Sequence, residues 1–428
     1  MLRFSFLGLL GFSSTLALLA VGCGSSTAGE LASSSSGGDF AGSMPSNSGQ
    51  TEGPAPGTLT AGDWDDNLNF ELFRAYVSDH VETDQNAQIK AEFASADRVV
   101  IQVETEDSGP ISNALVSIGD GEHTFFSGST GSDGRVLFFP QHDGAAGAQG
   151  LTVTIQPPAG QDGVQTLVAP PPGGNDWHFM LPGAVSVAPK SLDLAFVIDA
   201  TGSMGDEIGY LKSEVQGIAT SVQSQFQGVS IHYGLIVYRD EGDEFVTRTF
   251  NFTDNLGAFS FSLAQQFADG GGDMPEAMDQ AMELVPQLSW RSGNVARMAF
   301  LVADAPPHAE HAEAYLSAVN GLRPKGIKLY PVAASGVDID AEYMMRVGAE
   351  ATLGRYLFLT DDSGVGDPHE APHIPCYQVQ KLSKLMSRVI ASELSGTRVA
   401  ADPADVIRSV GSPVDGVCTM EDGTKAYF

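Results

Sequence analysis

Three oxygen-bearing side chains follow one another at alternating positions near the middle of the chain. The apolar, branched run Leu194–Ile198 is typical of a strand buried on both faces, and it ends on Asp199. Thr201 and Ser203 come next, separated by a glycine. Carboxylate and hydroxyl oxygens suit Mg²⁺, Mn²⁺ and Ca²⁺, and ligands of open parallel sheets bind beyond the carboxyl ends of the strands. This stretch therefore predicts a divalent-cation site at one edge of a sheet.

Two further acidic segments could complete such a site. The first is Gly-Gly-Gly-Asp-Met-Pro-Glu, which places Asp273 and Glu276 in a glycine-rich loop. The second is an apolar strand that begins near Phe300, ends on Asp304 and continues as Ala-Pro-Pro-His. Both supply oxygen donors, so three separate loops could surround one cation.

Taken in order, the three segments resemble the metal-ion-dependent adhesion site of von Willebrand factor type A domains. The stretch from Asp199 to Ser203 is similar to the first motif of that site, Asp-x-Thr-Gly-Ser. Together with Tyr238-Arg-Asp-Glu, the segments most resemble the type A domains of hemicentin-like and related bacterial proteins. The resemblance covers about residues 190–396.

The resemblance implies a role for each ligand. The hydroxyls of Thr201 and Ser203 would bind the cation directly, and Asp199 and Asp304 would bind directly or through water. A carboxylate from a partner protein would complete the octahedron. Mg²⁺ is the expected ion, with Mn²⁺ or Ca²⁺ as alternatives.

The second loop departs from the common pattern of the family. Asp273 stands where a threonine is usual, while Asp273, Pro275 and Glu276 resemble the integrin β subunits, in which the glutamate is the ligand. Asp273 and Glu276 are therefore alternative ligands of the second loop. Either acid adds negative charge, which favours cation retention and weakens the attraction for a partner carboxylate. The alternative to a metal site is a simple turn in which Asp199 and Ser203 cap the following helix.

Apolar strands and helical stretches alternate after residue 190. Such alternation predicts an α/β domain with a doubly wound, mostly parallel sheet, similar to a Rossmann fold. The segment 245–252 alternates in polarity and suits an antiparallel edge strand. We therefore assign residues 190–396 to a type A domain and residues 397–428 to a C-terminal tail with one possible helix near 403–410.

The region before this domain has a different pattern. Short β-rich runs separated by Gly, Asp and Pro clusters predict a small all-β sandwich over residues 97–185. Its sequence resembles carboxypeptidase-regulatory-like domains, which implies a structural or adhesive accessory. Residues 63–96 predict a short helical segment.

The N-terminus predicts export. Residues 1–22 carry one early arginine and a short apolar run, as in a signal peptide. The sequence Ala-Val-Gly-Cys that ends at Cys23 resembles a bacterial lipobox, which implies cleavage and lipidation at Cys23. Residues 23–62 are rich in Ser, Gly and Pro and predict a disordered tether. The expected location is the bacterial cell envelope or surface, with the outer membrane favoured in a Gram-negative cell and the lipid as the only membrane anchor.

The remaining cysteines are Cys376 and Cys418. An exported protein with an even pair predicts a disulfide between them. The spacing of His369, His373 and Cys376 also permits a zinc site.

Charge and motifs exclude several function classes. The chain has 22 basic and 53 acidic residues, a net charge of −31, which argues against nucleic-acid binding. The common nucleotide, serine-hydrolase and zinc-protease motifs are absent, so we expect no enzyme. The sequence thus predicts a metal-dependent protein-binding lipoprotein that acts in adhesion or assembly, with a protein or extracellular-matrix ligand. The alternatives are an envelope scaffold or sensor with a structural metal, and a hydrolase that carries these domains as accessories.

Overall fold

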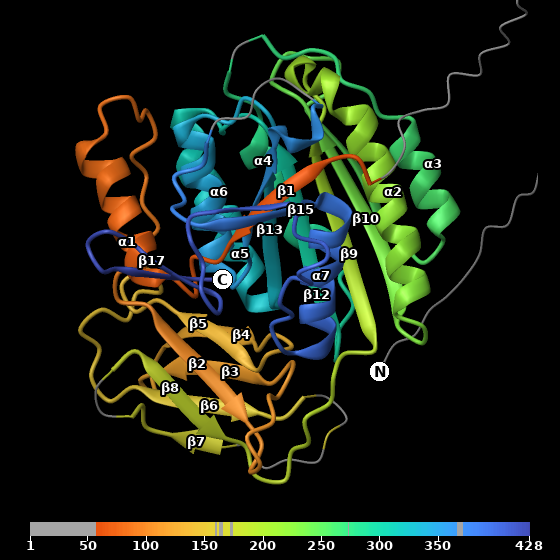
Figure 1. The fold of residues 1–428 in the computed structure, drawn as a ribbon. Coiled ribbons are helices and arrows are strands. Elements are labelled where there is room, and N and C mark those ends of the chain that lie inside the picture. The colour runs from red at the N-terminus through yellow and green to blue at the C-terminus, as the bar shows by residue number, and fades with distance from the viewer. Residues whose placement is uncertain (1–56, 159–160, 162–165, 172–173, 273, 366–370) are drawn as a thin grey trace, which may run out of the picture. The chain divides into compact units, whose positions relative to one another are not determined.

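The computed structural model describes residues 57–158, 161, 166–171, 174–272, 274–365 and 371–428 (Figure 1). The predicted signal peptide, the lipidation site at Cys23 and most of the predicted tether lie outside these residues. No helix in the described ranges is long and apolar enough to cross a membrane.

A nine-stranded mixed sheet forms the centre of the protein. Its order is β11-β10-β9-β12-β13-β14-β1-β15-β16. The five strands from β10 to β14 in this order are parallel, and β11, β1 and β16 each run antiparallel to their neighbours. The strands are β1 (Thr60–Trp64), β9 (Ser191–Asp199), β10 (Ser230–Tyr238), β11 (Thr247–Thr253), β12 (Ala296–Ala303), β13 (Ile327–Ala333), β14 (Tyr356–Thr360), β15 (Tyr377–Lys381) and β16 (Arg408–Val410).

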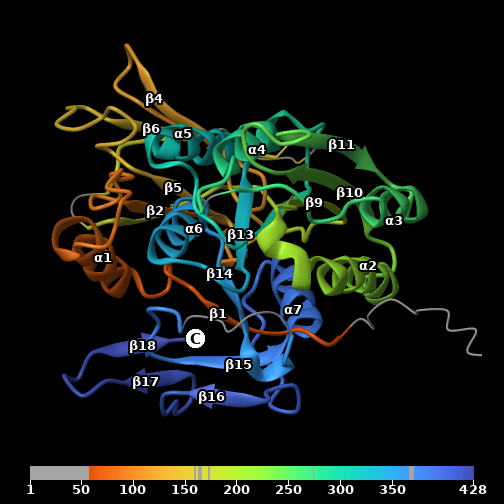
Figure 2. The same ribbon diagram turned by 90° about the horizontal axis from the view of Figure 1, so that it is seen from above.

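Helices cover both faces of this sheet because its central strands are apolar on both sides (Figure 2). In β9, Ala195 and Val197 face one core, while Phe196 and Ile198 face the other. One layer contains α4 (Met278–Leu284), α5 (Ala312–Leu322) and α6 (Ile339–Ala351); the other contains α2 (Ile208–Gln225), α3 (Leu256–Ala264) and α7 (Leu382–Ser395). The predicted doubly wound α/β fold is confirmed, and β11 is the antiparallel edge strand expected near residues 245–252.

The N-terminal boundary predicted from the sequence is wrong. Strand β1 crosses it and lies between β14 and β15, where all five of its residues are buried (Figure 1). Gly62 permits this insertion, because a Cβ atom there would lie 2.5 Å from the ring of Phe358. The predicted tether therefore ends before residue 60, and the segment 63–96 begins as a strand of the main sheet. Its helical part is α1 (Phe70–Ser78), followed by a π-helical turn, η1 (Asp79–Thr83).

Two small sheets between residues 99 and 180 form the predicted all-β region. Their orders are β5-β2-β8 and β4-β3-β6-β7. Alternate residues such as Ile101, Val116 and Val153 point into a shared core. The strands are β2 (Val99–Glu104), β3 (Leu115–Gly119), β4 (Thr124–Ser129), β5 (Arg135–Phe138), β6 (Thr152–Gln156), β7 (Thr166–Val168) and β8 (Asp176–Met180).

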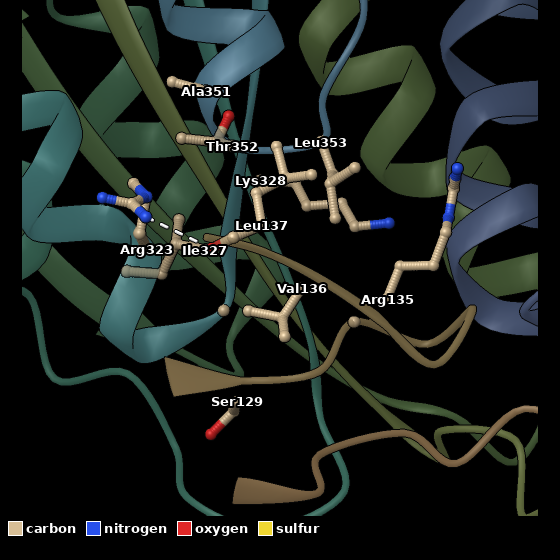
Figure 3. Close-up of a pocket in the computed structure, with 12 residues that line it drawn as sticks. Ser129, Arg135, Val136, Leu137, Arg323, Ile327, Lys328, Ala351, Thr352 and Leu353 are labelled. Atoms are coloured by element: carbon tan, nitrogen blue, oxygen red, sulfur yellow. Dashed lines mark hydrogen bonds between the residues drawn. The ribbon is translucent and has the colours of Figure 1, made fainter. Parts of the chain in front are cut away.

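Arg323 connects this β-sandwich to the larger sheet. It lies in a 3₁₀ turn after α5 and donates to both carboxylate oxygens of Asp143, at 2.8 and 2.9 Å. It also donates to the carbonyl of Leu137 at 3.2 Å (Figure 3). The pocket drawn in Figure 3 lies beside these contacts and has a volume of about 20 Å³. Since a buried water needs about 10–15 Å³, this pocket can hold about one water and no larger ligand.

The tail folds onto the sheet as strands. Strand β16 replaces the helix expected near residues 403–410, and β17 (Val417–Thr419) pairs with β18 (Lys425–Tyr427). A disulfide joins Cys376, beside β15, to Cys418 in β17. The remaining short 3₁₀ turns are η2 (Gly202–Asp206), η3 (Val285–Gln287), η4 (Ala309–His311), η5 (Arg323–Lys325) and η6 (Asp361–Ser363).

Candidate metal centre

Two predicted ligands lie at neighbouring strand ends. Asp199 is the last residue of β9, and Asp304 follows β12 directly. The two strands are parallel partners in register at Ile198 and Val302, so their carboxyl ends meet at the same edge of the sheet. Both acids are buried, with 0% and 4% of their surface exposed.

The first loop is fixed by its own side chains. Asp199 Oδ1 accepts hydrogen bonds from the backbone N–H of Thr201, at 2.9 Å, and from its hydroxyl, at 2.7 Å. The hydroxyl oxygens of Thr201 and Ser203 are 3.2 Å apart. Thr201 is fully buried, whereas Ser203 is exposed. The loop therefore presents one inner hydroxyl and one that faces solvent.

Backbone contacts bring the second and third loops to the first. Gly202 N–H donates to the carbonyl of Gly270 at 3.0 Å, and Glu276 N–H donates to the carbonyl of Pro306 at 3.0 Å. Gly271 has φ +69°, and a Cβ atom there would lie 2.9 Å from Glu276 Oε1 and 3.2 Å from Thr201 Cβ. Glycine is thus needed at this point, where it lets the Glu276 carboxylate approach the hydroxyl loop.

Burial and neighbouring carboxylates raise the pKa values of the acids in the site. Burial, followed by the charge of Asp304, raises the pKa of Asp199 to about 7. Burial raises the pKa of Asp304 to about 6. Burial and then the charge of Asp199 raise the pKa of Glu276 to about 9. Each carboxylate therefore lacks a neighbouring positive charge sufficient to stabilise it.

The donor set fits a hard divalent cation. Asp199 Oδ2, Glu276 Oε2 and Asp304 Oδ1 are buried carboxylate oxygens without a hydrogen-bond partner. Buried polar atoms are normally satisfied, so three such oxygens in adjoining loops need an explanation, and a bound cation supplies one. Among the described residues, no group of three or more His, Cys, Asp and Glu side chains could hold a metal by itself. A cation here therefore also depends on the hydroxyls of Thr201 and Ser203.

The predicted residues divide into two groups. Asp199, Thr201, Ser203, Glu276 and Asp304 come together at this edge of the sheet. Asp273 and Cys23 lie outside the described residues, so the structure places only Glu276 of the two alternative second-loop ligands. Neither Asp199 nor Ser203 caps α2, which follows Glu207 and has no capping side-chain hydrogen bond.

Arg239, part of the Tyr238-Arg-Asp-Glu segment, is a further residue of the site for which the sequence predicted no role. Its side chain is 1% exposed and donates to the carbonyl of Ala200, at 3.1 Å, and of Phe267, at 3.0 Å. It therefore joins the first loop to the segment that leads into the second. Its position directly after the apolar strand β10 was the available signal, since Asp304 has the same relation to its strand.

Two acids after β10 extend the negative region. Asp240 Oδ1 accepts a hydrogen bond from His308 Nε2 at 2.8 Å. Asp243 Oδ2 accepts from the backbone N–H of Gly271 at 2.9 Å. The charges of Asp240 and Asp243 also contribute to the raised pKa of Glu276. They support the second and third loops from the side of β10.

Comparison with known sequences matches part of the chain to one family. The family described as von Willebrand factor A domain matches residues 193–328. Alpha-protein kinase vwkA of Dictyostelium discoideum is 30% identical over 207 residues, which are 48% of this chain and 33% of that protein. An ariadne-like RING finger protein of Acanthamoeba polyphaga mimivirus, R811, is 32% identical over 117 residues, which are 27% of this chain and 11% of that protein. The chain thus spans a third or less of the length of these relatives.

Two solved structures are similar to part of the chain. BatB from Bacteroides thetaiotaomicron is 12% identical, with a TM-score of 0.33 over 47% of this chain and 98% of that one. The pilus adhesin SpaC from Lactobacillus rhamnosus GG, in an open conformation, is 13% identical, with a TM-score of 0.34 over 50% of this chain and 30% of that one.

Proposed function

Because the chain contains a von Willebrand factor A domain over residues 193–328, we propose that it is a divalent-cation-dependent protein-binding module. The cation, Mg²⁺ in the first instance, is held by Thr201, Ser203, Asp199, Asp304 and Glu276. The bound ion neutralises these acids and offers a coordination position to an oxygen from a partner. The partner in this proposal is a protein with an exposed carboxylate.

The observation that carries the proposal is the set of unpartnered oxygens on Asp199, Glu276 and Asp304. All three belong to buried carboxylates that approach one another at the carboxyl edge of the sheet. A divalent cation is a compact positive charge that binds oxygen and can satisfy several of them together. Exposed Ser203 marks the side from which a partner can reach the ion.

Glu276 affects how strongly the site binds the cation and a partner carboxylate. It adds a carboxylate to a site that already contains two, so the bound cation retains less positive charge for an external ligand. We therefore expect tight retention of the metal and modest affinity for the partner carboxylate, with neighbouring protein contacts supplying the remaining affinity.

The proposal includes anchoring at a bacterial envelope through lipidated Cys23. Its support is the sequence alone: a short apolar leader, the Ala-Val-Gly-Cys junction and the Ser- and Gly-rich stretch that follows. Metabolic labelling with a palmitate analogue tests it, because the Cys23→Ser variant would lose the label and leave the membrane fraction.

Metal binding is tested first on the full chain. We expect Mg²⁺, Mn²⁺ or Ca²⁺ to raise the melting temperature of EDTA-treated protein, since an ion at 100 times its dissociation constant adds about 2.7 kcal/mol of stability. The Asp199→Asn variant should lose this response. Asp254→Asn removes an exposed acid outside the site and serves as the matched control. A response of equal size in both variants would contradict the assigned ligands.

Partner binding is tested second. Ser203→Ala should abolish cation-dependent capture of envelope proteins while the protein stays folded. The main competing function is a scaffold or sensor with a structural metal, which the complete burial of Asp199 and Thr201 favours. In that case Ser203→Ala would lower stability and leave capture by the folded fraction unchanged.

A further inference from the structure

A cleft with several cationic side chains lies where the β-sandwich meets the amino ends of β9 and β12. Its volume is about 320 Å³. The sandwich supplies Asn113 and Ser129 to its lining, and the larger α/β part supplies the segment 290–293, Arg297 of β12 and Lys325. The cleft therefore depends on both parts of the protein.

This cleft is distant from the candidate metal centre. Arg291, one of its lining residues, binds Asp193 near the amino end of β9, whereas Asp199 ends the same strand. Six residues of strand separate the two acids, which at about 3.3 Å per residue is about 20 Å. A ligand in the cleft would thus not touch the cation.

Positive charge exceeds negative charge at the cleft. Arg291, Arg297 and Lys325 line it, and none of its lining residues within the described ranges is acidic. Asp193 neutralises Arg291, with 2.6 Å between Oδ1 and Nε. Arg297 and Lys325 instead donate to uncharged acceptors, and neither forms an ion pair in the part of the chain that the structure describes. An excess of two positive charges results, in a chain whose net charge is −31.

Arg297 is held in place by the protein itself. Its Nη1 donates to Asn113 Oδ1 at 2.7 Å, and its Nε and Nη2 donate to the carbonyls of Arg291, at 2.9 Å, and Gly293, at 3.1 Å. Burial lowers the pKa of Arg297, and the charge of Asp193 does not offset this effect. Cations in a cleft with protein walls attract anions from solution, so this cleft favours a negatively charged ligand.

Trp290 places an aromatic surface beside these charges. Its half-buried ring packs edge-on against Phe252, with 4.7 Å between the ring centroids, and its Nε1 donates to the carbonyl of Val285 at 2.7 Å. Ser129 and Ser292 add hydroxyl groups to the lining. A sugar ring has an apolar face and a rim of hydroxyls, so a sugar with an acidic group matches all three features of the cleft.

We propose that this cleft binds a hexuronate, a six-carbon sugar acid, as the free sugar or as one unit of an acidic polysaccharide. Arg297 and Lys325 attract its carboxylate, and Trp290 contacts the apolar face of its ring. Inorganic phosphate has no apolar face and gains nothing from the indole. The volume lies at the lower end of the range of about 300–1,000 Å³ found for ligand pockets, which suits one sugar unit.

Glucuronate is a suitable probe, with glucose as its uncharged counterpart. The full chain is titrated in EDTA, so that no cation at the other site can bind the carboxylate. Tryptophan fluorescence reports on Trp290, because Trp64 and Trp177 are 1% and 7% exposed and lie outside the cleft. Saturation-transfer NMR detects the bound sugar directly. We expect saturable binding of glucuronate that is at least tenfold tighter than that of glucose and that weakens as salt is added.

Lysine variants locate the binding. Lys325→Met removes one of the two unpaired charges and should weaken glucuronate binding at least fivefold. The matched control is Lys425→Met, because Lys425 is an exposed lysine of β18 that does not line the cleft. This control should bind glucuronate as the wild type does.

A second pair of variants separates charge from size. Ser292→Asp places a carboxylate in the cleft and should weaken glucuronate binding at least tenfold. Ser292→Asn adds a group of almost the same size without charge and should retain most of the binding. Ser292 is exposed, so neither change is expected to disturb the fold.

Four outcomes would overturn the assignment. They are no glucuronate binding, equal affinities for glucuronate and glucose, equal affinities in the two lysine variants, and tighter binding of phosphate than of glucuronate. None of them bears on the proposed cation site, because EDTA is present throughout.

Discussion

At the scale of single residues, Arg239 tests what holds the loops of the cation site in place. Its guanidinium donates to two backbone carbonyls of different loops and is almost fully buried. We expect Arg239→Met to lower the free energy of unfolding by about 1–3 kcal/mol, because two hydrogen bonds are lost and each contributes about 0.5–1.5 kcal/mol. The affinity for Mg²⁺ should fall as well, because Ala200 lies between the ligands Asp199 and Thr201.

Arg248→Met is the matched control for this prediction. Arg248 stacks on Phe245 and pairs with Glu244, as Arg239 does, but it is only partly buried. Urea unfolding and Mg²⁺ titration of both variants make the comparison. Equal Mg²⁺ affinities in the two variants would show that Arg239 does not position the loops.

Asp63 makes the stability of the protein depend on pH. Burial alone would raise its pKa, but Arg355, Arg388 and Arg398 outweigh burial and lower the pKa to about 2. A lowered pKa in the folded state gives stability that is present above about pH 4 and is lost as the pH falls toward 2. The shift corresponds to about 2 kcal/mol.

Urea unfolding between pH 6 and pH 2.5 measures this contribution. The free energy of unfolding of the wild type should fall more steeply below pH 4 than that of Asp63→Asn, which has no proton to gain at this position. Asp254→Asn, an exposed acid, should follow the wild type. Parallel curves for Asp63→Asn and the wild type would exclude the contribution.

At the scale of elements, we predict that the stability of the main sheet depends on strand β1. A fragment that begins at residue 190, the boundary expected from the sequence, lacks β1 and exposes the long edge of β14. It also loses the buried side chain of Trp64 and the partner of Arg355 and Arg388. We expect this fragment to aggregate or to melt well below a fragment of residues 57–428, as judged by size-exclusion chromatography and circular dichroism. Equal melting temperatures would mean that β1 contributes little to the fold.

The sequence predicted the elements whose signals are local. The β9 and β12 strands are continuous apolar runs that end on acids, so their type, their burial and the nearness of Asp199 and Asp304 followed from the parallel-sheet rule. Thr60–Trp64 contains Gly62 and two polar residues, and its burial depends on Phe358 and on three arginines far along the chain. No local pattern specifies such a partner.

The sequence failed to predict the strand of the tail and the role of Arg239 for the same reason. The strand Arg408–Val410 exists because Tyr377–Lys381 offers it an edge, and a three-residue strand has too few residues to show a period. Arg239 holds its loops through backbone carbonyls, which the sequence does not identify. Contacts between distant segments decided both cases.

At the scale of the whole molecule, Arg323 fixes the β-sandwich on the larger sheet. Replacing it by methionine leaves Asp143 buried without its cation, and removal of one partner of a buried ion pair costs about 3–5 kcal/mol. We expect Arg323→Met to lower the free energy of unfolding by this amount and to speed proteolytic cleavage between the sandwich and the sheet.

Lys325→Met provides the control. Lys325 belongs to the same turn but is exposed and donates only to the carbonyl of Pro286. This change should alter stability by less than about 0.5 kcal/mol. If urea unfolding and limited proteolysis gave the same result for both variants, the ion pair would not be what holds the two parts together.

The direction of β1 has a mechanical consequence. Thr60 lies opposite Thr360 at the carboxyl end of β14, so the chain enters the sheet at the edge that carries the cation ligands. A pulling force that reaches β1 through the residues before Gly57 and is resisted at this same edge acts across the strands, so the hydrogen bonds to β14 and β15 would open one after another from Thr60. The same edge would receive the force from a partner held at the cation. Tension between the two attachments would then pass across the carboxyl ends of the strands, and the β-sandwich would lie outside the line of force.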